Sequence, residues 1–415
     1  MKIVLGTSGT RGDVQPMVAL ALGLKKKRHE VLLVGPPEKM AWAKRLGCPY
    51  QGLGCDVTQF LDAIDNPISI PSAIKFMNYV RNEIRTQFEM LPGIIKGADL
   101  VIASSLMFAL SSIAEALNIK YLYVAFTPQL FPSSFHPFPV VKTQTLPGWC
   151  NRLSWQLASF GDRFNTGRLV NGYRKQFKLK PLSNLWIHVL GHNPIVACDP
   201  QIAQIPPDVT QGPIQTGYMH LHMPKPDYPE LEDFLISDSP PIYAGFGSMP
   251  PKDQAGHIPL FVKAARHLDR RIIISKVWPK SNDLSYSKDV FFIKNYPHEY
   301  LFPRTAAIIH HGGAGTTATA TRSGRPQIIV PHILDQYYHG HRVFMSGLGA
   351  KPVWRSGISL KTLIQALTFC FSNPDIQIRT KAVARSIQAE QSLANTIEII
   401  EQIKSKPLRQ GLPQI

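Results

Sequence analysis

The sequence has few cysteines and no long apolar run. Five cysteines are spread over 415 residues, none of them in a Cys-x-x-Cys pair, which indicates reduced thiols rather than a disulfide framework. No apolar stretch reaches the roughly 18 residues that a bilayer-spanning helix needs. The N-terminus runs straight into a glycine-rich turn and lacks the length of a signal peptide, so we expect a cytoplasmic protein.

Dense blocks of like charge are also missing. The longest basic run, Lys25 to Arg28, has only four residues, which is typical of a solvated helix end and too short for a nucleic-acid-binding arm. The chain nevertheless has 45 Lys and Arg against 28 Asp and Glu, a net charge of +17. This surplus is divided evenly about residue 210. We therefore expect no nucleic-acid partner. The basic excess would suit an anionic membrane surface, which attracts each nearby Lys or Arg with a free energy of about 1 kcal/mol.

Strand, helix and strand patterns alternate in both halves of the chain. Short apolar runs typical of buried strands, such as Ile3–Leu5 and Leu100–Ala103, precede helical patterns in the first half. Ile242–Gly245 begins the same alternation in the second half. Such alternation predicts an α/β fold with two Rossmann-like, doubly wound domains facing a cleft. The predicted units are an N-terminal domain, a proline-rich linker, a C-terminal domain, and a final helix and tail returning to the first domain. Their bounds are residues 1–205, 206–241, 242–385 and 386–415.

The first glycine turn, Gly6 to Asp13, stands between a strand and a helix. Its backbone amides and the helix N-terminus favour a phosphate or a reacting oxygen. The glycines do not follow the G-x-G-x-x-G dinucleotide pattern, and the lysine of a P-loop is absent, so NAD and ATP sites are disfavoured. Taken alone, the turn is also compatible with a structural role in which Asp13 only caps the helix.

A second turn, His310 to Thr317, follows a buried strand and opens a helix. Its three glycines expose amides, and its two histidines and two threonines add hydrogen-bond donors, a pattern that indicates a diphosphate cradle. Asp335 and Gln336 follow the next strand, and an acid beside an amide suits the vicinal hydroxyls of a sugar. Another predicted strand of the same domain ends in a turn of small residues, Gly245–Ser248. Taken alone, this turn is also compatible with a structural role.

These motifs together resemble a known family. Gly9–Pro16, Pro297–His298, Leu301–Pro303, and His310 through Gln336 are similar to UDP-glucose-dependent sterol glucosyltransferases and to bacterial enzymes that glycosylate antibiotic aglycones. The resemblance implies a GT-B architecture and an inverting, metal-independent transfer without a cofactor. It further implies that the first domain binds the acceptor and the second binds the UDP-sugar.

Carried over by position, the resemblance makes Asp13 the general base that deprotonates the acceptor hydroxyl. His311 would bind the pyrophosphate, Asp335 and Gln336 the glucose hydroxyls, and His298 with the backbone of Tyr296 the nucleoside. Arg11 could either pair with Asp13 or contact the donor. The remaining candidates for donor contacts are Thr10, Ser248, Gly313, Ala314, Gly315 and Thr316. Ala314 stands where some relatives have serine, which removes one hydroxyl.

The acceptor site is expected in an aromatic and proline-rich segment, residues 126–150, which has little periodicity and is predicted as a surface loop. Its candidate residues are Phe126, Phe131, His136 and Phe138. The segment between Ile64 and Met90 has the pattern of an amphipathic helix, either a plain domain helix or one that dips into a membrane surface. Together with the basic charge, these features favour a lipid-like acceptor taken from a bilayer.

The sequence predicts transfer of glucose from UDP-glucose to a sterol-like or other lipid hydroxyl. Transfer to a soluble polyketide or peptide aglycone needs the same donor site and stays open. A non-catalytic lipid or nucleotide-sugar binding protein is disfavoured because Asp13 and the Asp335–Gln336 pair are intact.

Overall fold

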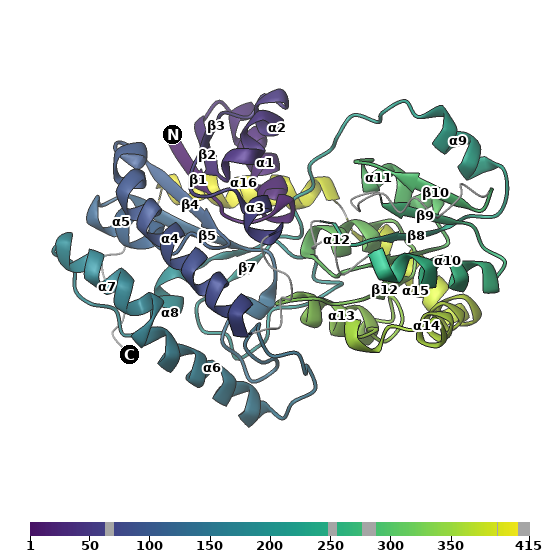
Figure 1. Cartoon of the computed structure of the whole chain (residues 1–415). Coiled ribbons are helices and arrows are strands. Elements are labelled where there is room, and N and C mark those ends of the chain that lie inside the picture. Colours follow the sequence, from purple (N-terminus) through teal and green to yellow (C-terminus); the bar gives the residue numbers. More distant parts are fainter. Residues whose placement is uncertain (63–69, 248–254, 276–287, 388, 406–415) are drawn as a thin grey trace.

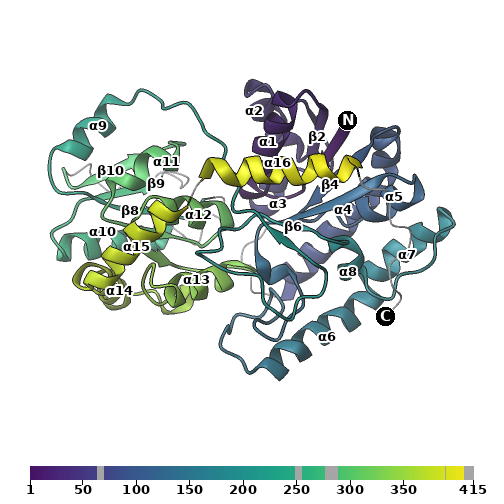
Figure 2. The same cartoon turned by 180° about the vertical axis from the view of Figure 1, so that it is seen from behind.

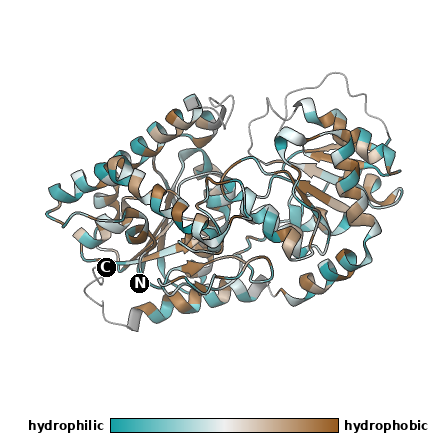
Figure 3. Cartoon of the chain, turned by 90° about the horizontal axis from the view of Figure 1, so that it is seen from below, coloured by the Kyte–Doolittle hydropathy of each residue, from teal (hydrophilic) through white to brown (hydrophobic). Residues whose placement is uncertain are grey.

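The computed structural model describes residues 1–62, 70–247, 255–275, 288–387 and 389–405. Two lobes lie side by side, and each contains a parallel β-sheet covered by helices (Figure 1). The strands are the most hydrophobic elements of both lobes, and the surrounding helices combine hydrophobic and hydrophilic residues (Figure 3). This is the doubly wound α/β architecture that the alternation predicts, and the fold class is confirmed. None of the described helices has the length and apolarity to cross a bilayer.

The first sheet has seven parallel strands in the order β3-β2-β1-β4-β5-β6-β7. The strands are β1 (Lys2–Gly6), β2 (Glu30–Gly35), β3 (Tyr50–Gly52), β4 (Leu100–Ser104), β5 (Lys120–Ala125), β6 (Ile195–Val196) and β7 (Ile214–Gln215). The chain order reverses between β1 and β4, which pair directly. Ligands of such sheets bind beyond the carboxyl ends of the strands at this switch point.

Helices cover both faces of the first sheet. They are α1 (Arg11–Lys26), α2 (Met40–Arg45), α3 (Val57–Asp62), α4 (Ile70–Ile95), α5 (Leu110–Ala116), α6 (Gly148–Phe164), α7 (Thr166–Gln176) and α8 (Leu185–Leu190). Alternate residues of β1 point to opposite faces. Ile3 and Leu5 pack in the core beside α1, and Val4 packs in the core beside α4 and α5.

The second sheet has five parallel strands in the order β10-β9-β8-β11-β12, with its switch point between β8 and β11. Its strands are β8 (Ile242–Gly245), β9 (Ile272–Ser275), β10 (Val290–Ile293), β11 (Ala307–His310) and β12 (Gln327–Ile329). The helices are α9 (Pro229–Ile236), α10 (Ile258–His267), α11 (His298–Leu301), α12 (Ala314–Arg322), α13 (Gln336–Met345), α14 (Leu360–Ser372) and α15 (Pro374–Ser386).

The last helix, α16 (Ala389–Ser405), crosses from the second lobe and lies along α1 of the first (Figure 2). Ile397 and Ile400 are buried in the first-domain core. The predicted return of the C-terminal helix is confirmed.

Two predicted loop segments are more ordered than expected. Within 206–241, predicted as linker, β7 extends the first sheet, Met219 is fully buried in the first-domain core, and α9 packs in the second domain. The prolines therefore lie between short packed elements. Within 126–150, predicted as a surface loop, Phe131 is fully buried and α6 begins at Gly148.

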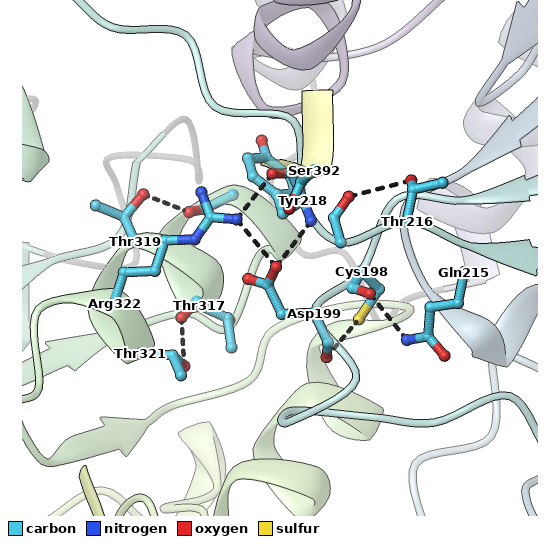
Figure 4. Close-up of polar contacts among 12 residues, drawn as sticks. Cys198, Asp199, Gln215, Thr216, Tyr218, Thr317, Thr319, Thr321, Arg322 and Ser392 are labelled. Carbon is cyan, nitrogen blue, oxygen red and sulfur yellow. Dashed lines mark hydrogen bonds and ion pairs between the residues drawn. The ribbon is translucent and has the colours of Figure 1, made fainter. Parts of the chain in front are cut away.

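A buried ion pair joins the two lobes (Figure 4). Asp199, which follows β6 of the first sheet, accepts a hydrogen bond from the Arg322 guanidinium of α12 at 2.9 Å. The same carboxylate oxygen accepts from the Tyr218 amide, and Arg322 also donates to the Tyr218 carbonyl. These bonds fix the position of α12 relative to the first sheet.

Candidate active site

The first switch point brings together a carboxylate and a hydroxyl. Asp13 lies in the first turn of α1, after β1, and Ser105 directly follows β4. The Ser105 hydroxyl donates to Asp13 Oδ1 at 2.7 Å. Ser105 has a φ of 53°, and its carbonyl accepts a hydrogen bond from the Tyr123 hydroxyl. Sequence reasoning missed Ser105, because nothing in its residue type indicates the left-handed backbone that aims it at Asp13.

The second oxygen of Asp13 closes a capping box. Oδ2 accepts from the Thr10 amide at 2.8 Å and from the Thr10 hydroxyl at 3.2 Å. Gly9 has a φ of 140°, and a Cβ there would collide with the Asp13 carboxylate. Burial raises the pKa of Asp13, the hydrogen bonds from Ser105 and Thr10 oppose this shift, and the charge of Asp335 adds to it. Asp13 is thus a positioned carboxylate with increased basicity.

Arg11 forms no ion pair with Asp13, the first of its two predicted contacts, and its contact with the donor stays a prediction. Its guanidinium lies over the Trp42 ring, 5.3 Å from the centroid, in a cation–π arrangement. Arg11 is close enough to His298 of the second domain for its charge to help lower the pKa of that imidazole. The basicity of Asp13 is therefore not reduced by an ion pair with Arg11.

Helix α12 contacts α1 across the domain boundary, and Ala314 at its N-terminus packs against the cores of the first domain. Gly313 is its N-cap, and no side chain in the described part of the chain caps the helix. The sequence Ala314–Arg322 is rich in threonine, a modest helix former, yet the hydroxyls of Thr317 and Thr319 donate to the carbonyls of Gly313 and Gly315. These bonds keep the hydroxyls within the helix and leave the first-turn amides for an anion.

The paired histidines have different roles. His310 is fully buried, and its Nδ1 accepts from the Gly312 amide at 3.1 Å. Its Nε2 must then carry the proton and donate to Gln327 Oε1 at 3.0 Å. His311 is half-buried, and its Nδ1 is buried without a hydrogen-bond partner among the described residues. We therefore correct the expectation that both imidazoles serve the cradle, since only His311 has a nitrogen to offer.

Asp335 and Gln336, the next predicted pair, also differ in their surroundings. Gln336 is buried, and its Oε1 accepts from the amides of His332 and Ile333 at 2.8 and 3.1 Å. Asp335 is half-buried, and burial raises its pKa to about 6. His339 Nδ1 lies 3.5 Å from Asp335 and donates to the Gly312 carbonyl at 2.9 Å. This histidine connects the two turns of the second domain.

The predicted nucleoside residues lie at the amino end of α11. The His298 ring stacks on Phe302 with 4.3 Å between centroids, and its Nε2 is hydrogen-bonded to the Tyr243 hydroxyl. Tyr296 packs its side chain in the second-domain core, so its side chain is not available to a ligand. Ser248, the other predicted donor contact, lies outside the described residues.

Tyr218 is a second residue that sequence reasoning missed. Its hydroxyl lies at the start of α12, where a Cβ on Gly315 would come within 2.6 Å of it. The charge of Asp13 also helps raise the pKa of Tyr218, after burial. Ala314 packs beside it against both cores of the first domain, so a methyl group suits this position. The proline-rich sequence around Tyr218 gave no signal that its hydroxyl would lie at the start of α12.

The predicted acceptor residues are buried to different extents. Phe131 and Phe126 belong to the two cores of the first domain. His136 is buried, and its ring meets Tyr338 of α13 edge-on with 5.5 Å between centroids. Phe138 is half-buried and packs on Trp155 and Trp186. His136 and Tyr338 also line a cavity of about 190 Å³ between the domains.

Neutral imidazoles dominate the second-domain side of the boundary. Burial lowers the pKa of His298, His332 and His339 to about 4 and that of His310 to about 3, and it lowers the pKa of His311 well below its usual value. These imidazoles are therefore hydrogen-bonding groups rather than cations at neutral pH. No three His, Cys, Asp or Glu side chains come together as a metal site in the described part of the chain.

Family models match both halves of the chain. Residues 3–135 match the glycosyltransferase family 28 N-terminal domain, and residues 260–403 match the erythromycin biosynthesis protein CIII-like C-terminal domain.

Curated relatives align over nearly the whole chain. Glycosyltransferase GtfE of Amycolatopsis orientalis is 32% identical over 95% of this chain and 96% of its own length. The vancomycin aglycone glucosyltransferase of the same organism is 31% identical over 94% and 95%. The sterol 3-beta-glucosyltransferase UGT80A2 of Arabidopsis thaliana is 30% identical over 96% of this chain and 65% of its own length.

Solved structures share the fold. The glycotransferase of kitacinnamycin superimposes with a TM-score of 0.74 at 15% identity, over 96% of this chain and 98% of its own. The glycosyltransferase VinC, solved in complex with dTDP, has a TM-score of 0.67 at 18% identity, over 97% and 99%.

Proposed function

Because the chain belongs to the GT-B glycosyltransferases, which transfer a sugar from a nucleotide sugar to a small-molecule acceptor, we propose that it transfers glucose from UDP-glucose to a lipid hydroxyl. The acceptor would be sterol-like or another membrane lipid, and the enzyme would act peripherally on the cytoplasmic face of an anionic membrane. The observation that carries the proposal is the pairing of Asp13 with an uncapped helix N-terminus across the domain boundary.

Asp13 is proposed as the general base. An acceptor hydroxyl is a poor nucleophile, so its proton must pass to a carboxylate as the oxygen attacks the anomeric carbon. Burial makes Asp13 more basic, and Ser105 and Thr10 hold its orientation. The new bond forms from the acceptor oxygen to the anomeric carbon as the bond from that carbon to the diphosphate breaks, which inverts the centre.

The departing diphosphate is proposed to lie at the N-terminus of α12. Negative charge accumulates on it in the transition state, and fixed amides with a helix dipole stabilise such charge. His311 would add one neutral hydrogen bond from its unpartnered ring nitrogen. Asp335 would hold the hexose hydroxyls, while Gln336 would mainly shape the turn through its bonds to His332 and Ile333.

A screen of membrane lipids tests the proposal. Purified protein is incubated with a lipid extract, with and without UDP-glucose, and the lipids are compared by mass spectrometry. We expect a hexose mass increase on one lipid species and release of UDP, and Asp13→Asn should abolish both. If no lipid species gains a hexose, while UDP release depends on a soluble compound, the lipid acceptor is wrong.

Transfer to a soluble aglycone is the second candidate. The near-full-length match to GtfE and to the vancomycin aglycone glucosyltransferase favours it. The two candidates share the donor site and differ in the acceptor. A parallel incubation with polycyclic polyketide and glycopeptide aglycones, with UDP-glucose and dTDP-glucose as donors, distinguishes them.

A further inference from the structure

Helix α6 exposes apolar side chains along its whole length. Each has 43–69% of its surface exposed, and they are Trp149, Leu153, Leu157, Phe160 and Phe164. At about 100° per residue, these five positions fall within an arc of about 80° and extend for about 22 Å. We call this set the α6 stripe.

The opposite side of α6 fixes the orientation of the stripe. Asn151 is buried, and its amide nitrogen donates to the Ser134 carbonyl at 2.8 Å. Trp155 is also buried, and its ring nitrogen donates to the His136 carbonyl at 3.2 Å. The helix thus buries a polar side chain and exposes apolar ones. Single exposed apolar residues need no explanation, but five in one row indicate an interaction surface.

The surroundings of the stripe are strongly basic. Residues 142–180 contain eight Lys and Arg but only one acidic residue, Asp162. Arg174 is buried and paired with Glu115, so seven cations remain against one carboxylate, a surplus of six. Arg152 and Arg163 are exposed on α6 itself. At the end of the stripe, Arg81 and Arg168 line a cavity of about 520 Å³ together with Phe164, and its lining includes no carboxylate.

We propose that α6 docks on an anionic lipid bilayer, with the stripe at the boundary between headgroups and acyl chains. An exposed apolar helix face with Trp and Phe, flanked by basic residues, is the pattern of an interfacial helix. The basic surplus favours a bilayer over a second copy of this chain, because two copies of the same cationic face repel each other. The arginine-lined cavity beside Phe164 suits an anionic headgroup.

The docked helix would also present the candidate acceptor loop to the membrane. The hydrogen bonds from Asn151 and Trp155 hold the loop, and the Phe138 amide donates to the Ser154 hydroxyl at 3.0 Å. This consequence rests on the proposed function, since it assumes a lipid acceptor. Docking itself does not require transfer and can be measured without a donor.

Co-sedimentation of the full chain with vesicles tests the docking. We expect the protein to bind vesicles of phosphatidylcholine with phosphatidylserine, and to bind phosphatidylcholine alone much more weakly. Leu157→Glu should reduce binding to the mixed vesicles at least tenfold, because it places a charge in the middle of the stripe. Ile378→Glu is the matched control: it makes the same kind of change at an exposed apolar position of α15 and should bind like the unaltered chain.

Three results would overturn the proposal. The first is equal binding of the two variants, and the second is no binding of the unaltered chain to mixed vesicles. The third is a dimer in sedimentation equilibrium that Leu157→Glu converts to monomer, since a second copy would then cover the stripe. A chain that binds vesicles through the stripe but glycosylates no lipid would leave the docking intact and refute only the lipid acceptor.

Discussion

Each domain ends a central strand in a glycine-rich turn that opens a helix, but the two helix N-termini are covered differently. In α1, the third helical residue is Asp13, and its carboxylate caps the helix through Thr10. In α12, the corresponding residue is Thr316, and none of the side chains that the structure describes caps the helix. One N-terminus therefore holds its own anion, and the other leaves amides for an anion that comes from outside. Under the proposed function, the same local fold would supply a base on one side and a diphosphate site on the other.

Removing the charge of Asp13 should have the largest effect. Asp13→Asn keeps a side-chain oxygen for the helix cap but removes the base, so we expect turnover to fall by about 100- to 10,000-fold. Donor binding should change little, because the proposed donor site lies at α12 and not at α1. Steady-state kinetics measures the first effect and a calorimetric titration with UDP the second. Near-normal turnover in a folded Asp13→Asn protein would remove Asp13 from the mechanism.

The adjacent histidines provide the next test. His311→Ala should weaken UDP binding by about 10- to 100-fold, the cost of one hydrogen bond to a charged group, and leave the melting temperature unchanged. His310→Ala should instead lower the free energy of unfolding by about 1–3 kcal/mol, because Gln327 and the Gly312 amide lose their buried partner. If both variants lost only donor affinity, the division between the two imidazoles would be wrong.

An acidic residue at the third position of α12, as in α1, should abolish the difference in anion binding between the two helix N-termini. Thr316→Asp places a carboxylate at the position that Asp13 occupies in α1, where it repels the diphosphate and competes for the amides. We expect UDP to bind at least tenfold more weakly, which corresponds to about 1.4 kcal/mol, while the helix is slightly stabilised. Thr316→Asn is the neutral control and should bind UDP nearly normally. Equal affinities of both variants would place the diphosphate elsewhere.

Local sequence pattern was sufficient to predict the parts of the fold that it determines. Buried strands and helical spacing predicted both sheets, and the glycine turns before α1 and α12 indicated anion sites, whereas the role of Asp13 as a base came from the family resemblance. The residue pattern could not separate His310 from His311, because the two differ only in which way the end of β11 directs them; the family resemblance alone pointed to His311. Ser105 reaches the site through its left-handed backbone conformation. Tyr218 reaches it by packing against Gly315, which is far away in the sequence. Helix α6 was missed because its apolar face is exposed and it follows a proline-rich segment.

The smallest expected effect concerns how Ser105 sets the acidity of Asp13. The Ser105 hydrogen bond favours the carboxylate and so lowers a pKa that burial raises. In Ser105→Ala the pKa of Asp13 should rise further, because the carboxylate loses a hydrogen bond that favours its charged form. Since the base must be ionised, the acid limb of kcat/KM should move to higher pH, while the rate at high pH is largely kept.

Ser104→Ala is the matched control for this shift. Ser104 precedes Ser105, is fully buried, and its hydroxyl has no hydrogen-bond partner among the described residues. Its loss should leave the pH profile in place, although it removes the same atom one residue away. A uniform loss of rate in Ser105→Ala, without movement of the acid limb, would mean that Ser105 only supports the local structure. A shift of the acid limb in Ser105→Ala but not in Ser104→Ala would show that the first domain adjusts the pKa of its own carboxylate, Asp13. The N-terminus of α12 has no such carboxylate and needs no such adjustment.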